Sequence, residues 1–117
     1  MLVSADRVQL QQLLLNLILN ACEAMSSQPA STRRLHINAR RESAKAILAV
    51  ADAGPGLPNN IEQIFQPFHT TKPRGLGMGL AICRSIATSH QGDLTAFPNA
   101  EGGATFQLTL PILTSAS

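Results

Sequence analysis

Seven of the eight glycines fall in three short clusters, at positions 54/56, 75/77/79 and 102/103. The middle cluster, Gly75-Leu-Gly77-Met-Gly79-Leu80, runs into a predicted helix. Glycines before a helix N-terminus expose backbone N–H groups at the positive end of the helix dipole, which together bind phosphate. Lys72 and Arg74 add two cations just upstream. The spacing differs from the dinucleotide-binding fingerprint. It therefore indicates a phosphate site of another kind, with a flexible hinge as the alternative.

A carboxylate precedes the first glycine cluster. Asp52 follows the apolar run at 46–51 and is itself followed by Gly54 and Gly56. A carboxylate at a strand end can accept a hydrogen bond from an amine, and the glycines allow backbone to approach a ligand closely. A surface turn explains the same residues when they are taken alone. The third cluster, followed by Thr105, is by itself typical of a plain hairpin turn.

A polar stripe is predicted along the first helix. Asn16, Asn20 and Glu23 lie at helical spacing beside an apolar face. A boundary between core and solvent suits the wall of a pocket. An ordinary amphipathic boundary is the alternative interpretation.

The elements that would position these residues follow from hydrophobic periodicity. The pattern predicts helices at 6–25 and 79–90, strands at 35–39, 46–51, 93–97 and 105–110, and a short helical turn at 61–65. Leu35, Ile37 and Ala39 are expected to be half-buried, and Ile82 to point inward beside Cys83. This order predicts an α+β two-layer sandwich, with helices packed on one face of a mixed β-sheet.

Composition excludes several classes of protein. The chain has 117 residues, enough for one domain, and 44% of them are hydrophobic. It has no Trp or Tyr and a net charge of +2 without a basic patch, which argues against a nucleic-acid partner. Cys22 and Cys83 can form neither a disulfide framework nor a zinc site by themselves, and both are expected to be small buried hydrophobes. No apolar run is long enough to span a membrane.

Together, five segments resemble the N box, first glycine box, F box, second glycine box and third glycine box of the sensor histidine kinase ATP-binding domain. The F box is Phe65-Gln-Pro-Phe68-His-Thr-Thr-Lys72. The resemblance runs from about Asp6 to Pro111 and is strongest to the nitrogen-regulation and oxygen-sensing subgroup. It implies the Bergerat-type ATP fold that gyrase, the heat-shock 90 chaperone and MutL share.

The resemblance also implies a role for each matching residue, with ATP and Mg²⁺ as ligands. Asn20 matches the asparagine that coordinates Mg²⁺, and Asp52 matches the aspartate that contacts the adenine amino group. Phe65 and Phe68 match residues that pack the ATP lid. The remaining expected nucleotide contacts are Gly54 and Gly56 at the base, Gly75, Gly77, Gly79 and Leu80 at the lid hinge and phosphate-binding helix, Lys72 and Arg74 in the lid, and Thr105 beside adenine.

Asn16 bears on the type of reaction. In ATPases of this fold, the residue four positions before the metal-binding asparagine is a glutamate that activates water. Asn16 cannot act as a general base, whereas phosphoryl transfer to a delivered nucleophile depends on positioning and charge neutralisation. We therefore expect Asn16 and Asn20 to serve a kinase. Glu23 departs from the lysine found at this position in many histidine kinases, which removes one phosphate contact.

The expected partners lie outside this chain. None of His36, His69 and His90 falls in a long helix of the kind that carries an acceptor histidine. The chain is therefore expected to be a single catalytic domain, 1–117, of a larger kinase that forms homodimers. This domain is expected to lie in the cytoplasm, as the cytoplasmic portion of a sensor kinase that is either soluble or membrane-bound. The isolated domain is expected to be a monomer that is inactive alone, with the acceptor on a separate dimerisation domain and a response regulator downstream. A catalytically silent regulatory module and an anti-sigma-type serine kinase remain as alternatives.

Overall fold

The computed structural model describes residues 5–66, 79–100 and 102–112. In chain order, the elements are α1 (Arg7–Ala24), η1 (Ala30–Thr32), β1 (Leu35–Glu42), β2 (Lys45–Asp52), η2 (Ile61–Phe65), α2 (Gly79–Ser89), β3 (Asp93–Pro98) and β4 (Ala104–Pro111). The predicted elements are all present, and η1, within a stretch expected to be a loop, is an addition.

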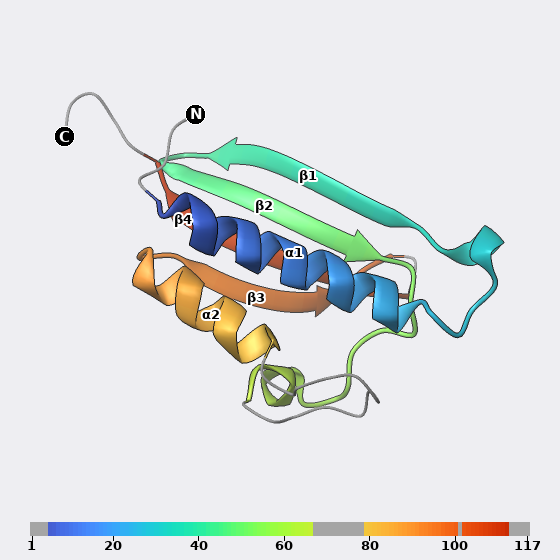
Figure 1. Cartoon of the computed structure of the whole chain (residues 1–117). Helices are drawn as coiled ribbons and strands as arrows, with labels where there is room; N and C mark the ends of the chain where they lie inside the picture. Colours follow the sequence, from blue (N-terminus) through green and yellow to red (C-terminus); the bar gives the residue numbers. More distant parts are fainter. Residues whose placement is uncertain (1–4, 67–78, 101, 113–117) are drawn as a thin grey trace.

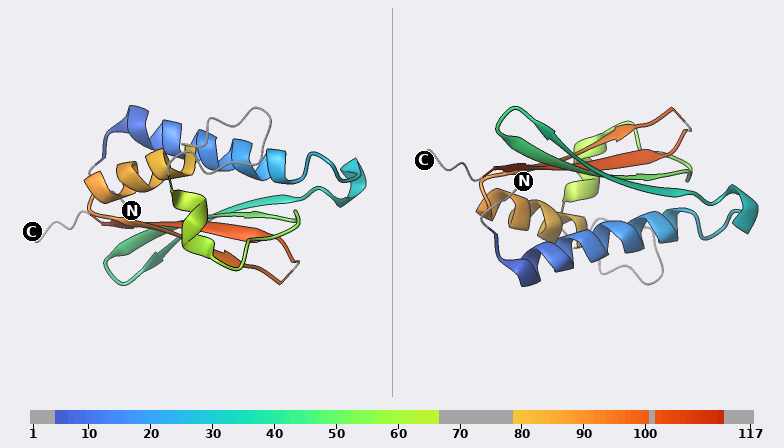
Figure 2. Two further views of the ribbon diagram at one scale, coloured as in Figure 1. Left: turned by 90° about the horizontal axis from the view of Figure 1, so that it is seen from below. Right: turned by 90° about the horizontal axis from the view of Figure 1, so that it is seen from above.

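The four strands form one sheet in the order β1-β2-β4-β3. Both α helices pack on the same face of this sheet, as the edge-on views in Figure 2 show. The predicted two-layer sandwich is therefore confirmed. The three strand pairings are antiparallel, whereas a mixed sheet was expected. Two of these pairings, β1 with β2 and β3 with β4, are hairpins, and a hairpin joins antiparallel strands.

Helix α1 is stabilised by a cap at its N-terminus and by apolar residues at helical spacing. The Asp6 carboxylate accepts a hydrogen bond from the Gln9 N–H at 3.1 Å and caps the first turn. Leu13, Leu17 and Ala21 then recur every four residues and are buried against the sheet.

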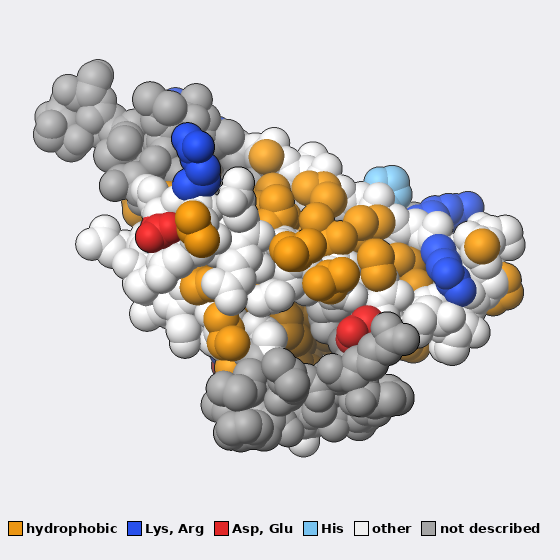
Figure 3. Space-filling model, in the orientation of Figure 1, with side chains coloured by type: hydrophobic (Ala, Val, Ile, Leu, Met, Phe, Trp, Pro, Cys, Tyr) orange, Lys and Arg blue, Asp and Glu red, His pale blue; other side chains and the backbone are white. Residues whose placement is uncertain are grey.

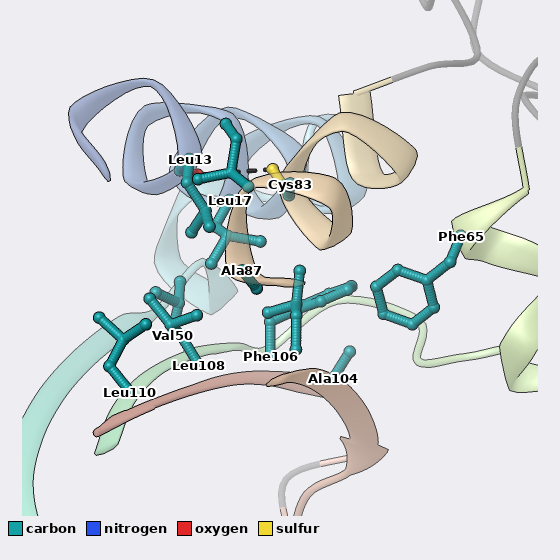
Figure 4. Close-up of a cluster of buried hydrophobic side chains, with 12 residues drawn as sticks. Leu13, Leu17, Val50, Phe65, Cys83, Ala87, Ala104, Phe106, Leu108 and Leu110 are labelled. Carbon is teal, nitrogen blue, oxygen red and sulfur yellow. Dashed lines mark hydrogen bonds between the residues drawn. The ribbon is translucent and has the colours of Figure 1, made fainter. Parts of the chain in front are cut away.

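The core lies between the helices and the sheet (Figure 4). Leucines of α1 meet Cys83 and Ala87 of α2 above the apolar side chains of β2 and β4. Phe65 is a core residue that meets Phe106 edge-to-face, with ring centroids 6.3 Å apart. The lid that Phe65 was expected to pack lies outside the described residues.

The two α helices run antiparallel (Figure 1), and two contacts fix their alignment. At one end, the Asp6 N–H donates to His90 Nε2 at 2.9 Å. Further along, the Cys83 thiol donates to the Leu13 carbonyl at 3.6 Å. Ile82 was expected to point inward, but it is 36% exposed because the buried face of α2 is formed by Cys83, Ile86 and Ala87. Neither described helix combines the length and apolar character needed to cross a bilayer.

Strand β1 forms as predicted, but all 8 of its residues are exposed, so it is not half-buried. Ile37 is 49% exposed, because β1 is an edge strand and no helix covers it. An apolar hollow of about 320 Å³ lies between α1 and the sheet, lined by leucines of α1 and by residues of β1, β2 and β4. Figure 3 shows the apolar surface that gathers on this side of the molecule.

Arg84 of α2 links three elements. Its guanidinium forms a bidentate ion pair with Glu62 at 2.6 and 3.1 Å, lies 3.9 Å from the centroid of the Phe65 ring and donates to the Leu94 carbonyl. The hydrogen bond from Arg84 lowers the pKa of the Glu62 carboxyl below its usual value. One side chain therefore fastens η2 and the first residues of β3 to α2.

Candidate functional site

Asp52 ends β2 with a carboxylate that is only 3% exposed. Its Oδ1 atom accepts hydrogen bonds from the Gly54 N–H at 2.9 Å and from the Ala104 N–H at 3.2 Å. Among the described residues, both hydrogen bonds to this carboxylate fall on Oδ1. The second oxygen, Oδ2, therefore keeps its capacity to accept a hydrogen bond from a ligand.

Glycines surround this carboxylate because side chains would not fit. A Cβ atom on Gly54 would lie 3.1 Å from Asp52 Oδ1, and one on Gly103 would lie 2.8 Å from the same oxygen. Gly56 has a φ of +95°, and its Cβ atom would lie 2.8 Å from the Gly102 carbonyl oxygen. The loop after β2 and the turn between β3 and β4 are therefore in backbone contact around Asp52.

The turn between β3 and β4 contains a residue that the sequence analysis did not single out. The Asn99 side chain donates to the Asp52 carbonyl at 2.9 Å and lies 3.4 Å from Thr105 Oγ1. Thr105, expected beside adenine, is buried one residue beyond Ala104. The available sequence pattern was an asparagine directly after a strand and three residues before a glycine pair, which is common in turns.

The polar stripe of α1 faces the start of α2. The side chain of Asn16 lies near the thiol of Cys83 and acts to lower the pKa of that thiol. Because the helices are antiparallel, the residue one turn before Cys83, Gly79, lies beside the second half of α1, where Asn20 is located. The structure thus brings Asn16, Asn20 and the N-terminus of α2 to one region.

Several predicted contacts lie outside the described residues. These are Phe68, Lys72, Arg74, Gly75 and Gly77. Of the rest of the second glycine box, Gly79 is exposed at the first position of α2, and Leu80 is partly buried against the core.

Burial makes the Cys83 thiol a poor nucleophile. Desolvation raises its pKa from 9.0 to about 11, although Asn16 acts in the opposite direction. Cys22 was expected to be buried, but it is exposed on α1. The two cysteines therefore differ in their access to reagents.

We expect iodoacetamide to modify Cys22 but not Cys83 in the folded chain at about pH 8. Intact-mass spectrometry should find one adduct before unfolding and two in denaturant. A Cys22→Ser variant serves as the control and should gain no adduct while folded. Rapid modification of Cys83 in the folded chain would contradict its burial.

The raised pKa of Cys83 also makes the stability of the fold depend on pH. Because the neutral thiol is favoured in the folded state, Cys83 should stabilise the fold fully below pH 9.0 and lose that contribution as the pH rises to about 11.

Within the described residues, no three His, Cys, Asp or Glu side chains gather into a cluster that could hold a metal ion. A divalent cation at Asn20 would therefore need most of its oxygen ligands from a bound phosphate and water. Mg²⁺ is usually held in that way.

The sequence matches known proteins over most of its length. Residues 5–114 match the model of the family described as "Histidine kinase-, DNA gyrase B-, and HSP90-like ATPase". The C4-dicarboxylate transport sensor protein DctS of Rhodobacter capsulatus is 43% identical over 111 residues, which cover 94% of this chain and 17% of that protein. This chain thus spans about one sixth of the length of DctS.

Solved structures agree with this match. The nucleotide-free catalytic domain of histidine kinase ThkA has a TM-score of 0.80 and 37% sequence identity, covering 93% of this chain and 70% of that chain. Full-length ShkA in complex with AMPPNP has a TM-score of 0.78 and 27% identity, covering 98% of this chain and 24% of that chain. The buried aspartate, the glycine-lined backbone and these matches lead to one conclusion: the chain belongs to the histidine kinase-, DNA gyrase B- and HSP90-like ATPase family, as a domain similar to the catalytic domains of sensor histidine kinases.

Proposed function

We propose that this domain binds ATP with Mg²⁺ and transfers the γ-phosphoryl group to a histidine on the dimerisation domain of the same kinase. The observation that carries the proposal is the buried Asp52 carboxylate, which two backbone amides hold by one oxygen while Oδ2 keeps acceptor capacity. Such a group suits the exocyclic amino group of adenine. The match to ShkA, solved with the ATP analogue AMPPNP, supports the same ligand.

The phosphates would lie toward the start of α2. A helix of 11 residues presents free N–H groups and a positive dipole end at its first turn, and glycine at its first position keeps that end open. Asn20, near this helix end, would supply an amide oxygen to Mg²⁺, while the phosphates and water supply the others. The ion, when bound, neutralises charge on the β- and γ-phosphates.

Transfer itself requires little acid–base chemistry from this chain. The bond between the γ-phosphorus and its bridging oxygen breaks, a bond from phosphorus to an imidazole nitrogen forms, and ADP leaves. The attacking nitrogen uses its own lone pair, so no general base is needed at the moment of attack. Asn16 fits that requirement, because its amide does not titrate.

The setting of the domain is part of the proposal. A homodimeric parent kinase would bring the acceptor histidine to the site, and a response regulator would receive the phosphoryl group. We place the domain in the cytoplasm because ATP is available there. The domain is proposed to be a monomer by itself and inactive without its acceptor.

The test combines nucleotide binding with transfer. The 117-residue chain is titrated with ATP with and without Mg²⁺, then incubated with γ-labelled ATP and a supplied dimerisation domain. We expect binding that strengthens with Mg²⁺ and label that is acid-labile, as phosphohistidine is. Acid-stable label would favour the serine kinase. Tight binding without transfer to any histidine-bearing domain would favour the regulatory module, and absence of binding would overturn all three.

A further inference from the structure

Asn99 forms several hydrogen bonds around the candidate site. Its amide nitrogen donates to the Asp52 carbonyl at 2.9 Å, and its amide oxygen accepts from the Gly103 N–H at 3.1 Å. Its own backbone N–H also donates to the Gly103 carbonyl at 3.0 Å. One half-buried side chain thus joins the end of β2 to the turn between β3 and β4.

These bonds determine where the Asp52 carboxylate can lie. Gly103 directly precedes Ala104, and the Ala104 N–H is one of the two donors to Asp52 Oδ1. By holding Gly103, Asn99 fixes the position of that donor. By holding the Asp52 carbonyl, it also fixes the backbone from which the carboxylate extends. Both the main chain and the side chain of Asp52 are therefore constrained through Asn99.

We propose that Asn99 is a positioning residue that enables the site to discriminate nucleotides by the amino group of the base. It keeps Asp52 Oδ1 on two backbone amides, so that Oδ2 faces the ligand as an acceptor. Without the amide of Asn99, the Asp52 backbone and the Ala104 donor are no longer held in place. The carboxylate can then turn so that neither oxygen faces the base squarely, which weakens the preference for a base bearing an amino group. This inference rests on the proposed function, because it assumes that Asp52 contacts adenine.

The test compares two nucleotides in three proteins. Affinities for ATP and for purine ribonucleoside triphosphate, which lacks the 6-amino group, are measured for the chain, for Asn99→Asp and for Gln28→Ala. The wild-type chain should prefer ATP by about 10- to 100-fold, as expected for one hydrogen bond to a charged group. Asn99→Asp retains an acceptor for Gly103 but loses the donor to Asp52. Its preference should fall by about tenfold, while its affinity for the analogue changes by less than about threefold.

Gln28→Ala is the matched control. The Gln28 side chain donates to the Ala53 carbonyl at 3.1 Å, next to Asp52, but contacts neither the Asp52 carboxylate nor its donors. Its loss should leave the preference for ATP unchanged. Equal loss of affinity for both nucleotides in Asn99→Asp would mean a merely structural role and would overturn the inference, as would an unchanged preference.

Two further results separate the possible failures. If the wild-type chain binds no nucleotide, the proposed function fails. If it binds and discriminates but Asn99→Asp discriminates equally well, only the role of Asn99 fails. Should Asn99→Asp not unfold cooperatively, the same measurements are made on Asn99→Ser, whose shorter side chain cannot span from the Asp52 carbonyl to the Gly103 amide. Its preference should also fall by about tenfold.

Discussion

Replacing Asp52 with asparagine is expected to lower the affinity of the chain for ATP by about 100-fold or more. The amide oxygen of asparagine can still accept from the Gly54 and Ala104 N–H groups, which need a buried acceptor. Its amide nitrogen then takes the place of Oδ2 and presents a donor to the adenine amino group, which is also a donor. Calorimetric titration of ATP into both proteins measures the loss.

Alanine at the same position separates folding from binding. Asp52→Ala leaves two backbone amides without an acceptor, so we expect the free energy of unfolding to fall by about 1–3 kcal/mol in addition to the loss of nucleotide. The free energy of unfolding of Asp52→Asn should lie within about 1 kcal/mol of that of the wild-type chain. An asparagine variant that binds ATP with unchanged affinity would remove Asp52 from the proposed site.

The second large effect is expected from Gly103→Ala. A Cβ atom there would lie 2.8 Å from both the carbonyl carbon and Oδ1 of Asp52. The carbonyl belongs to the backbone of a central strand and cannot rotate aside as a flexible side chain would. Overpacking of this kind should lower the free energy of unfolding by about 3 kcal/mol and remove nucleotide binding as well. Denaturant unfolding monitored by circular dichroism measures the change.

Gly102→Ala is the natural comparison for this variant. The neighbouring glycine has a φ of +87° but no atom within 4 Å of its would-be Cβ. Alanine there should cost only the strain of a left-handed backbone, about 1 kcal/mol. If the two variants are destabilised equally, contact of the added Cβ atom with Asp52 does not explain the need for glycine at position 103.

Local sequence patterns predicted the elements well. The short turn at Ile61–Phe65 has the predicted bounds, and α1 (Arg7–Ala24) lies within one residue of the predicted helix at 6–25. These features depend on neighbours in the chain, so the sequence displays them directly. The prediction that β1 is half-buried was wrong. The burial of this strand depends on whether a helix covers it, which is a property of the assembled layers.

The candidate site divides in the same way. Asp52 and its glycines could be predicted because a carboxylate at a strand end beside glycines is an unusual local pattern. Asn99 could not, since its partners lie up to 47 residues away and an asparagine in a turn is ordinary. The third glycine cluster alone favoured a plain hairpin turn, and only the assembled sheet shows that Gly103 lies against Asp52.

The order of the strands has a consequence for how the molecule folds. Each hairpin, β1 with β2 and β3 with β4, closes over a short loop, but β2 meets β4 only after more than 50 residues of intervening chain are brought together. Non-local pairings of this kind form late, because the entropy of closing the loop is lost before the contacts are gained. Asp52 and Ala104 face each other across that junction. We therefore expect nucleotide binding to appear only in the last kinetic phase of refolding, after the secondary structure of both hairpins has formed.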